Sequence, residues 1–532
     1  MIRVMSNSSE IAGTVASDDR EYPGAHTQTA IAGVVIGELE RVLPATARRP
    51  LTAQTSLSAC GIDDVLLGDA VARIEGRYGM RFRAEWLAPV RSCGDLVDCI
   101  AERMFDAADR TADQAAEALP SRSRLVEQRT SPAPATGGVF PECAALEQRL
   151  ADLQAAGLEN PFRLATESVR GRTARIGGRE VVCFTSFDYL GLGSHPDVIQ
   201  GAKDAIDRFG CGASASRMVG GNNILLDELD TELAAFMGAE RATVFPCGYG
   251  TNASVFAHLF GREDLILYDE LAHNSIVQGA NASQAATRSF RHNDHDQLDA
   301  LLRDIRGRYR RVVVAIEGVY SMDGDYPDLP RFIEVKQRHD ALLYVDEAHS
   351  IGTMGQNGRG ICEFFDVDPA AGDLWMGTIS KAFGSGGGYL AGNRELIDYL
   401  GLTTPAFVFS TACSPPNAAA ALAAVRVLQR EPERVERLRE RSELFLKLAN
   451  DVGLDTGSSG DTPVIPVILG SSQRALAVSQ QLLELGINAR PILYPAVRES
   501  AARVRFFVTS EHSEEQIVAA VEAVAEVAAA TS

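Results

Sequence analysis

Apolar residues recur along the larger, later part of the chain in two different spacings. Short continuous apolar runs at 243–245, 311–316 and 341–345 are typical of strands that are buried on both faces. Segments 196–209 and 226–236 instead place apolar residues three or four positions apart, which is the spacing of an amphipathic helix. Strands that alternate with helices predict an α/β fold with a largely parallel sheet covered on both faces.

The end of the chain predicts a second, smaller α/β arrangement. An Ala-rich stretch soon after residue 410 has helical character, and the run 504–508 reads as a strand. We therefore expect the main sheet within 139–410, together with an N-terminal extension, and a small C-terminal domain over 411–532.

The beginning of the chain has a different character. Apolar residues at helical spacing and the capping-box pattern of Ser92 and Asp95 predict a small helical bundle over 28–105. Residues 106–138 are rich in Ala, Pro, Gly and Ser, a composition that cannot bury a core. The sequence thus predicts a small unit joined to a larger one by a linker.

Composition narrows the classes of function. The 532 residues carry a formal net charge of −20, which argues against a nucleic-acid partner because binding phosphates requires a basic surface. Scattered cysteines without a Cys-x-x-Cys pair suggest free thiols in a reducing compartment. Residues 1–28 lack the pattern of a secretory signal, and no apolar run approaches the roughly 18 residues of a membrane span. We therefore expect a cytoplasmic protein.

Reactive side chains follow two of the apolar segments. Asp346 comes directly after the run 341–345, and Lys381 lies in Thr378-Ile379-Ser380-Lys381. A carboxylate at the carboxyl edge of a parallel sheet and an amine nucleophile are what a pyridine-aldehyde cofactor needs. Taken alone, Asp346 could equally cap a turn, and His349 could be satisfied by the backbone.

A glycine-bearing turn at 246–252 lies between the strand 243–245 and a predicted helix at 253–260. Backbone N–H groups at the start of such a helix favour a phosphate. By itself the motif is weak, because many turns from strand to helix contain glycine.

The run His292-Asn293-Asp294-His295-Asp296 resembles a set of metal ligands. It directly precedes a predicted helix at 298–305, however, and Asn and Asp favour helix starts. We therefore expect capping here, and no metal site.

A series of short motifs between residues 160 and 528 occurs in one consistent order. They are Asp188-Tyr189-Leu190-Gly191-Leu192, Ala213-Ser214-Ala215-Ser216-Arg217, Asp269-x-x-x-His273-Asn274-Ser275, Glu317-Gly318-Val319-Tyr320-Ser321-Met322-Asp323-Gly324-Asp325, Asp346-Glu347-Ala348-His349, Thr378-x-Ser380-Lys381 and Phe409-Ser410-Thr411. This series resembles the α-oxoamine synthases, fold-type I pyridoxal phosphate (PLP) enzymes that include serine palmitoyltransferase and 8-amino-7-oxononanoate synthase. The resemblance implies a PLP-binding domain over 139–410 and pyridoxal 5′-phosphate as cofactor.

The resemblance also implies roles for the matching residues. Lys381 would be the Schiff-base lysine and the acid and base at the substrate α-carbon, His273 would stack on the cofactor ring, and Asp346 would pair with its nitrogen. The residues expected at the cofactor are Gly248, Tyr249, His273, Ser321, Asp346, His349, Thr378, Ser380 and Lys381, with Ser410 and Thr411 reaching the phosphate from the second subunit of a homodimer. Those expected at the substrate are Arg505, which would hold the amino-acid carboxylate, Asp188 and Ser214; Arg503 is expected to be a solvated neighbour.

Some positions depart from the family pattern. Phe187 and Asp188 stand where several members have Asn near the Tyr-Leu-Gly run, Leu226 replaces a common His, and Asn274 replaces the Ala of His-Ala-Ser. These positions border the acyl and amino-acid pocket in relatives. These departures leave the identity of the substrate open, but they do not affect the prediction of the cofactor.

The unit over 28–105 resembles an acyl carrier protein at Thr55-Ser56-Leu57, 61–65 and 94–97. In that family a serine carries the phosphopantetheine arm, but the matching residue here is Asp64, whose carboxylate cannot form the phosphodiester. We expect a degenerate carrier domain that docks, positions or dimerises without a prosthetic arm.

The resemblance implies a decarboxylative Claisen condensation of glycine, alanine or serine with an acyl thioester of coenzyme A or an acyl carrier protein. An aminotransferase of the same fold and a non-catalytic carrier-docking scaffold remain alternatives. The sequence leaves open the amino acid, the acyl chain, its donor and the pathway.

Overall fold

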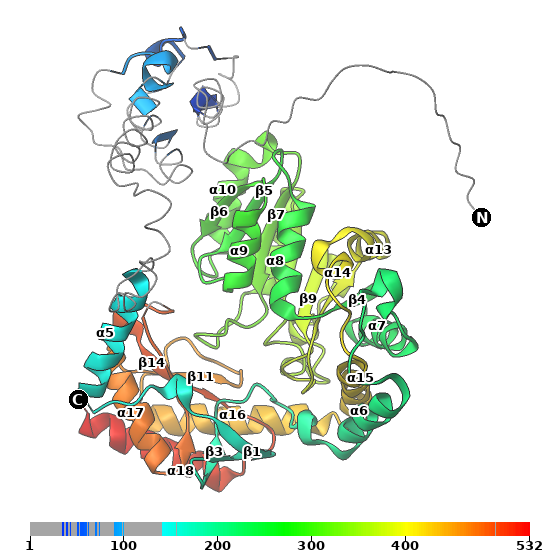
Figure 1. Cartoon of the computed structure of the whole chain (residues 1–532), viewed down its shortest axis with the longest axis vertical. Helices are drawn as coiled ribbons and strands as arrows, with labels where there is room; N and C mark the ends of the chain where they lie inside the picture. Colours follow the sequence, from blue (N-terminus) through cyan, green and yellow to red (C-terminus); the bar gives the residue numbers. More distant parts are fainter. Residues whose placement is uncertain are drawn as a thin grey trace, which may run out of the picture. The chain divides into compact units, whose positions relative to one another are not determined.

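A computed structural model gives the fold of the chain (Figure 1). It describes residues 141–531 except 156 and 495, together with positions 35–36, 39–40, 43, 51–52, 54–60, 62, 67, 70–71, 74, 90–97 and 99–100. The chain divides into two compact units, residues 1–135 and 136–532, and each is considered by itself.

The larger unit is built on a seven-stranded sheet with the order β4-β10-β9-β8-β7-β5-β6. The pairs from β9 to β6 are parallel, and β10 is antiparallel to both of its neighbours. The strands are β4 (Arg241–Phe245), β5 (Leu265–Asp269), β6 (Ala286–Phe290), β7 (Val312–Glu317), β8 (Leu342–Asp346), β9 (Leu374–Thr378) and β10 (Gly388–Gly392). The predicted mainly parallel α/β sheet is confirmed.

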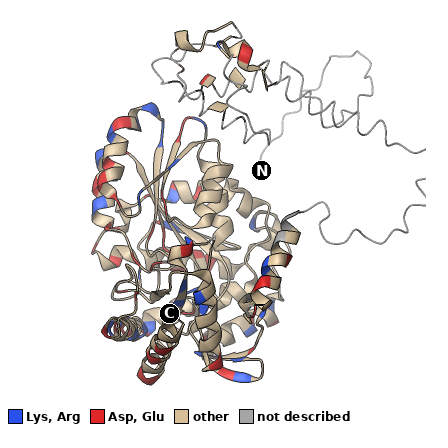
Figure 2. Ribbon diagram, turned by 90° about the vertical axis from the view of Figure 1, so that its left-hand side faces the viewer, with Lys and Arg blue, Asp and Glu red and all other residues tan. Residues whose placement is uncertain are grey.

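Helices cover both faces of this sheet, and the alternation along β7 shows why. Val313 and Ala315 pack into one core, and Val312, Val314 and Ile316 pack into the other. Side chains of a strand point alternately to opposite faces, so a strand between two helical layers must be apolar throughout. Figure 2 shows the consequence, since the strands of this sheet are mostly tan while Lys, Arg, Asp and Glu colour the helices.

The two helical layers come from different parts of the sequence. One core includes residues of α8 (Gly248–Leu259), α9 (Asn274–Ala282), α13 (Arg394–Thr403) and α14 (Pro405–Val408). The other includes residues of α6 (Pro196–Phe209), α7 (Ile224–Met237), α10 (His295–Ile305), α11 (Leu329–Arg338), α12 (Ile361–Phe364) and α15 (Pro415–Arg430).

Two smaller sheets complete the larger unit. One has the order β1-β2-β3-β12 and the other β11-β14-β13. Their strands are β1 (Thr166–Arg170), β2 (Thr173–Ile176), β3 (Arg179–Cys183), β11 (Val464–Ile468), β12 (Ile487–Asn488), β13 (Arg490–Ile492) and β14 (Arg503–Phe507); the helices of this region are α5 (Pro141–Ala155), α16 (Glu433–Asp451), α17 (Ser472–Glu484) and α18 (Glu514–Ala530). The pairing of β3 with β12 joins residues near 180 to residues near 487.

Each helix and strand predicted in the larger unit is present, but two helices begin earlier than expected. One is α10, which begins at His295 instead of residue 298, and the other is α8. The expected helix at 253–260 is α8, which already begins at Gly248. Sequence reasoning assigned its first turn to the loop because Gly248 and Gly250 are poor helix formers. The earlier start brings the first backbone N–H groups of α8 next to the end of β9, where Thr378 lies.

The described part of the smaller unit has its own apolar core, which includes Val35, Leu39 and Leu96. The capping box predicted at Ser92 is present: the Asp95 backbone N–H donates to Ser92 Oγ (3.2 Å), and the Ser92 N–H donates to Asp95 Oδ2 (2.9 Å). Asp64 and the linker at 106–138 lie outside the described residues.

None of the described helices is both long enough and apolar enough to cross a membrane. All the cysteines of the sequence are free thiols.

The close contact between α8 and α9 gives a test of the fold. A Cβ on Gly279 would lie 2.9 Å from the Ala253 Cα and the Asn252 carbonyl oxygen, whereas a Cβ on Gly261 would meet nothing within 4 Å. We expect Gly279→Ala to destabilise the larger unit by about 1–3 kcal/mol because the two helices must move apart. Gly261→Ala should stay within about 0.5 kcal/mol. Urea unfolding measures both, and equal midpoints would contradict the packing.

Candidate active site

Buried carboxylates end three neighbouring strands of the central sheet. Asp269 is the last residue of β5, Glu317 of β7 and Asp346 of β8, and each side chain is buried. Glu317 and Asp346 are paired in the sheet register. The carboxyl ends of parallel strands meet at one edge, so the sheet itself gathers these acids.

A cavity of about 300 Å³ opens at this edge. It is lined by Cys247, Gly248, Tyr249, Asn252, His273, Ser275, Glu317, Asp346, Ala348, His349, Met376, Thr378, Ser380 and Lys381. The structure therefore brings the predicted Lys381, Asp346, His273 and His349 together with the residues predicted around a phosphate.

Lys381 follows the end of β9, and its amine faces the cavity with few partners. Its Nζ lies 5.8 Å from the centre of the Phe187 ring. Burial lowers the pKa of Lys381 to about 8, although Asp346 and Glu317 act in the opposite direction. An amine with this pKa is partly deprotonated near neutral pH, and its free form can act as a nucleophile or a base.

Asp346 is held by two hydrogen-bond donors. The Asn252 amide donates to its Oδ2 (2.7 Å), and the Ala348 backbone N–H donates to Oδ1 (2.9 Å). Asn252 is in turn fixed by the buried Tyr344 hydroxyl, which donates to its Oδ1 (2.6 Å). The two donors hold the carboxyl group of Asp346 in one orientation in the cavity wall.

His273 caps α9, where its Nδ1 lies 2.7 Å from Ser275 Oγ. Its backbone N–H donates to Glu317 Oε1 (2.5 Å). Burial lowers the pKa of His273, with Asp346 opposing and Lys381 adding to the shift. Burial and the nearby Asp346 raise the pKa of Glu317 well above its usual range. Burial near Lys381 thus disfavours the charged forms of both His273 and Glu317.

His349 is buried on the side of β14. Its Nδ1 lies 2.7 Å from the Tyr189 hydroxyl, and its ring stacks on Phe507 at 6.4 Å between centres. Burial holds the pKa of His349 well below its usual range, and Lys381 contributes to the lowering. Since these contacts fix the ring, His349 presents a neutral imidazole to the cavity in one orientation.

Hydroxyl and amide groups form another part of the cavity lining. Thr378 Oγ1 lies 2.7 Å from Ser380 Oγ, next to the first turn of α8. The N–H groups of Gly248 and Tyr249 have no partner within the helix because they belong to its first turn. A Cβ on Gly248 would lie 3.0 Å from Thr378 Oγ1, so glycine is required for this close approach. The arrangement is a typical anion site.

Arg505 on β14 approaches the site from the small C-terminal sheet. Its Nη1 donates to the Ser321 carbonyl (2.5 Å), and its Nε is buried without a hydrogen-bond partner. Burial lowers the pKa of Arg505 to about 10. The prediction that Arg503 is solvated is wrong: its side chain is 5% exposed and pairs with Asp323 at 2.6 Å. Residues two positions apart on a strand point to the same face, so Arg503 and Arg505 both meet the loop that holds Asp323, and this loop covers Arg503.

The remaining predicted residues lie outside the cavity lining. Asp188 Oδ2 accepts from the Gly193 N–H (3.0 Å), and burial raises the pKa of Asp188 to about 6. Ser214 is exposed with a φ of 59°. Ser321 meets Arg505 through its carbonyl oxygen.

Ser410 and Thr411 follow α14 on a partly exposed segment. The N–H of the next residue, Ala412, donates to the Ala215 carbonyl (2.9 Å), so this segment lies beside the one that carries Ser214.

Comparison with known proteins gives the family. The sequence signature of the aminotransferase class I and II family matches residues 179–524. The chain belongs to this family.

Its relatives place it among the α-oxoamine synthases, as the motifs predicted. It is 39% identical over 382 residues to an 8-amino-7-oxononanoate synthase from Symbiobacterium thermophilum, covering 72% of this chain and 97% of that protein. A serine palmitoyltransferase from S. paucimobilis, in a structure with a bound PLP–myriocin aldimine, has a TM-score of 0.71 and 29% identity over 74% of this chain and 99% of that one. The Sphingomonas wittichii serine palmitoyltransferase has a TM-score of 0.70 and 31% identity over 73% and 97%.

In the sequence of this α-oxoamine synthase, Glu317 and Tyr189 lie in the family motifs and Asn252 lies in the glycine-bearing turn, but none of the three was predicted to have a role. Asn252 contacts Asp346, and Tyr189 contacts His349. Glu317 contacts the backbone of His273. The spacing of Asn252 from Gly248, one helical turn, could have indicated that both face the same side of α8.

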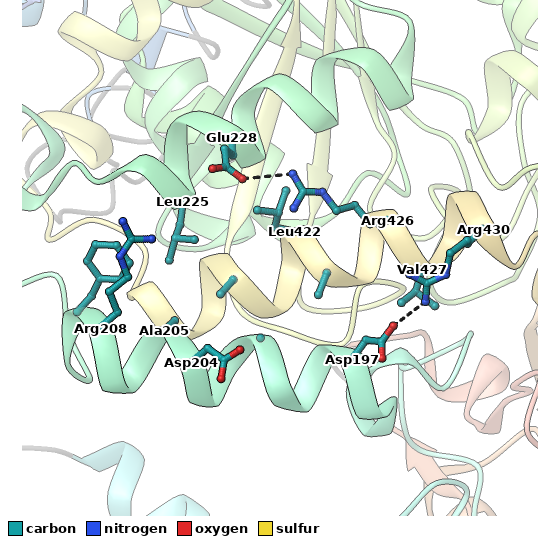
Figure 3. A pocket seen from close by; sticks show the side chains of 14 residues that line it. Asp197, Asp204, Ala205, Arg208, Leu225, Glu228, Leu422, Arg426, Val427 and Arg430 are labelled. Carbon is teal, nitrogen blue, oxygen red and sulfur yellow. Dashed lines mark hydrogen bonds and ion pairs between the residues drawn. The ribbon is translucent and has the colours of Figure 1, made fainter.

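Another hollow of the larger unit carries no such chemistry. A groove of about 400 Å³ runs between α6, α7 and α15, and two ion pairs cross it (Figure 3). Arg426 binds Glu228 (3.2 Å), and Arg430 binds Asp197 (2.6 Å). The charges of these two arginines are therefore neutralised by acids on the neighbouring helices.

The His292–Asp296 run behaves partly as predicted. Asp294 caps α10 by accepting from the Gln297 N–H (2.7 Å). His292 instead bridges two acids, Asp269 (2.9 Å) and Asp325 (2.7 Å). Within the described residues no group of three or more His, Cys, Asp or Glu side chains is arranged to hold a metal ion.

His292 makes stability depend on pH in a defined direction. Burial alone would lower the pKa of His292, but hydrogen bonds to Asp269 and Asp325 outweigh it and raise the pKa to about 10. Because the pKa of His292 is higher in the folded protein than in the unfolded chain, protonation of His292 favours the folded state. This stabilisation is complete below the unfolded pKa of about 6.5, and it is lost as pH rises through the folded pKa of about 10. We expect the stability difference between the native protein and His292→Gln to be constant below pH 6 and to shrink between pH 7 and 10. Thermal unfolding across this pH range measures it, and a pH-independent difference would show that His292 is not charged.

Proposed function

We propose that this chain is a PLP-dependent enzyme that condenses a small α-amino acid with an acyl thioester. The amino acid is glycine, alanine or serine, and the thioester is carried by coenzyme A or an acyl carrier protein. The products are an α-aminoketone, carbon dioxide and the free thiol. The observation that carries the proposal is the cavity in which the amine of Lys381, with its lowered pKa, faces the fixed carboxylate of Asp346.

The cavity suits pyridoxal phosphate in its chemistry. The first turn of α8 with Thr378 and Ser380 offers an anion site for the phosphate, and Asp346 offers the negative charge that a pyridinium nitrogen requires. Lys381 is the amine that would bind the aldehyde. His273 would lie against the ring, and His349 would hold the phenolic oxygen.

The substrate carboxylate would bind Arg505. A guanidinium holds a carboxylate through two parallel hydrogen bonds, and the buried Nε of Arg505 has no other partner. The Ser321 carbonyl fixes the other side of the guanidinium. Arg505 would therefore orient the amino acid with its α-carbon toward Lys381.

Proton transfer at the α-carbon would fall to Lys381. When bound, pyridoxal phosphate withdraws electrons from the substrate α-carbon, which makes loss of a proton and attack on a thioester possible. With a pKa of about 8, Lys381 can accept that proton near neutral pH and return one later. Asp346 would hold the proton of the ring nitrogen.

A homodimer would complete the phosphate site. Phe409 is 85% exposed beside Ser410 and Thr411, and Val219 is 83% exposed. Large apolar side chains on one region of a surface are typical of protein interfaces. These features support the proposal that a second copy covers this region and receives Ser410 and Thr411.

The smaller unit would serve the thioester substrate. Its described core and its Ser92 capping box are consistent with the proposed carrier-like helical bundle. A carrier-like domain without its serine would dock or position a separate acyl carrier protein, and would not carry the acyl group itself.

The central test is turnover with and without Lys381. We incubate the PLP-loaded protein with glycine, alanine or serine and an acyl thioester, and measure carbon dioxide and the aminoketone by mass spectrometry. Lys381→Ala should lower turnover by about 10²–10⁴-fold and remove the visible absorbance of the lysine-bound cofactor. Lys203→Ala, an exposed lysine on α6, should leave both unchanged. Unimpaired turnover of Lys381→Ala, or amino-group loss without carbon dioxide, would refute the proposal.

Arg505 is tested through the affinity for the amino acid. Removing a charged hydrogen-bond partner costs about 1.5–3 kcal/mol, so Arg505→Ala should raise the KM for the amino acid roughly tenfold to a hundredfold. The KM for the acyl thioester should stay constant. Arg338→Ala, which removes a surface partner of Asp299, serves as the control. An unchanged amino-acid KM in Arg505→Ala would place the carboxylate elsewhere.

A further inference from the structure

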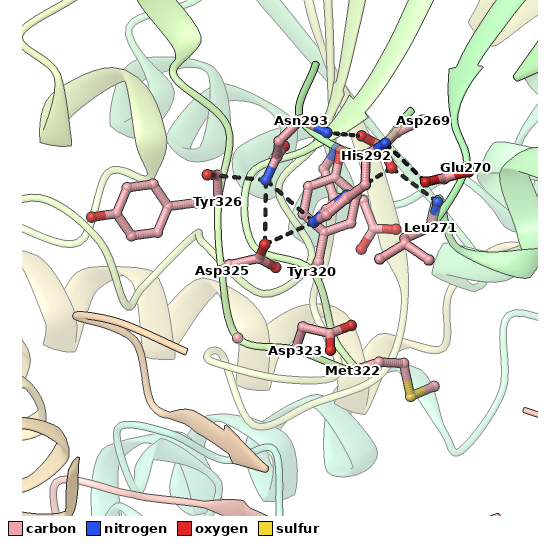
Figure 4. Close-up of polar contacts among 12 residues, drawn as sticks. Asp269, Glu270, Leu271, His292, Asn293, Tyr320, Met322, Asp323, Asp325 and Tyr326 are labelled. Atoms are coloured by element: carbon pink, nitrogen blue, oxygen red, sulfur yellow. Dashed lines mark hydrogen bonds and ion pairs between the residues drawn. The ribbon is translucent and has the colours of Figure 1, made fainter. Parts of the chain in front are cut away.

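The half-buried His292 connects two segments that lead toward the site. His292 Nδ1 lies 2.9 Å from Asp269 Oδ1, and its Nε2 lies 2.7 Å from Asp325 Oδ2 (Figure 4). The ring of Tyr320 meets the imidazole edge to face at 4.5 Å. The backbone N–H of His292 donates to Glu270 (3.2 Å), which adds a third acid nearby. A protonated imidazole is the one charge state that donates to both bridged carboxylates at once.

The Asp269 side of this bridge is a tight turn that leads to His273. The Leu271 N–H donates to Asp269 Oδ1 (2.9 Å), and the Ala272 N–H donates to the Asp269 carbonyl oxygen (2.9 Å). The next residue is His273, whose side chain lines the cavity. A shift of Asp269 would therefore pass directly to His273.

The Asp325 side is a closed loop that holds Arg505. The Tyr320 N–H donates to the Asp325 carbonyl (2.9 Å), and the Gly324 N–H donates to the Tyr320 carbonyl (2.8 Å), so the loop is compact. Its Ser321 carbonyl accepts from Arg505 Nη1.

The same loop is anchored to β14 and β11. Asp323 pairs with Arg503 at 2.6 Å. A Cβ on Gly324 would overlap the Val464 carbonyl oxygen at 1.9 Å, so the loop rests directly on β11.

From this geometry we infer that His292 is a positioning residue that clamps the turn at 269–273 to the loop at 320–325, and thereby sets the distance between His273 and Arg505. The inference rests on the proposed function for the roles of those two residues. His292 touches neither substrate nor cofactor and acts through the two segments.

Hydrogen–deuterium exchange of the protein without cofactor or substrate tests the clamp itself. In His292→Gln, peptides that cover 269–275 and 318–326 should exchange faster, while peptides of β4 and α15 should be unchanged. His295→Gln alters a neighbouring histidine that pairs with the exposed Asp296, and it should leave all these peptides as in the native protein. If His292→Gln does not fold, Asp325→Asn removes one arm of the clamp and should loosen 318–326. Native exchange in both segments, or loosening spread over the whole unit, would overturn the inference.

Steady-state kinetics tests the link to the substrate. We expect His292→Gln to raise the KM for the amino acid about tenfold or more through Arg505, with the KM for the acyl thioester unchanged. A loss of folded protein would instead lower kcat and leave both KM values constant. An unchanged amino-acid KM would overturn the inference. Absence of turnover in the native protein would refute the proposed function, while the exchange experiment would still decide whether the clamp exists.

Discussion

Carboxylates buried at the ends of neighbouring parallel strands dominate the structure of this site. Removing an ionised carboxylate from water costs several kcal/mol unless a counter-charge or hydrogen-bond donors replace the water. Asp346 accepts hydrogen bonds from the Asn252 amide and a backbone N–H, and Asp269 is paired with His292. Glu317 accepts from one backbone N–H, and burial raises its pKa, which favours its neutral form. The sheet thus requires donors and cations at this one edge, and Lys381 is the amine left facing the cavity.

The donors come from segments far apart in the sequence. Asn252 comes from α8, one turn after its start, His292 from the residues before α10, and Arg505 from β14 of a separate sheet. Each segment is fixed by its own packing, such as the close contact of Gly279 with α8. The positions of the donors around the buried carboxylates therefore depend on several local structures that meet at the ends of β5, β7 and β8.

The residues that depart from the family pattern differ in how close they lie to the cavity. Leu226 is fully buried in the core of α7, so its side chain contributes packing. Asn274 begins α9 and accepts from the Tyr249 hydroxyl at 3.1 Å, at the rim of the cavity. Asp188 holds a loop through Gly193, and Phe187 beside it faces Lys381. Asn274 and Phe187 are thus the departures closest to the reacting groups.

The sequence by itself determined the sheet, its family and the group of residues around Lys381. Apolar runs such as 312–316 require burial on both faces, and a residue at the end of such a run must lie at the sheet edge, as Asp346 does. The tertiary structure alone decided which side chains satisfy the buried charges. The roles of His292, Asn252 and Arg503 depend on distances between residues 23 to 181 positions apart, such as those of His292 to Asp269 and Arg503 to Met322. No local pattern encodes such a distance, because it is set by the packing of the helices and strands between the two residues.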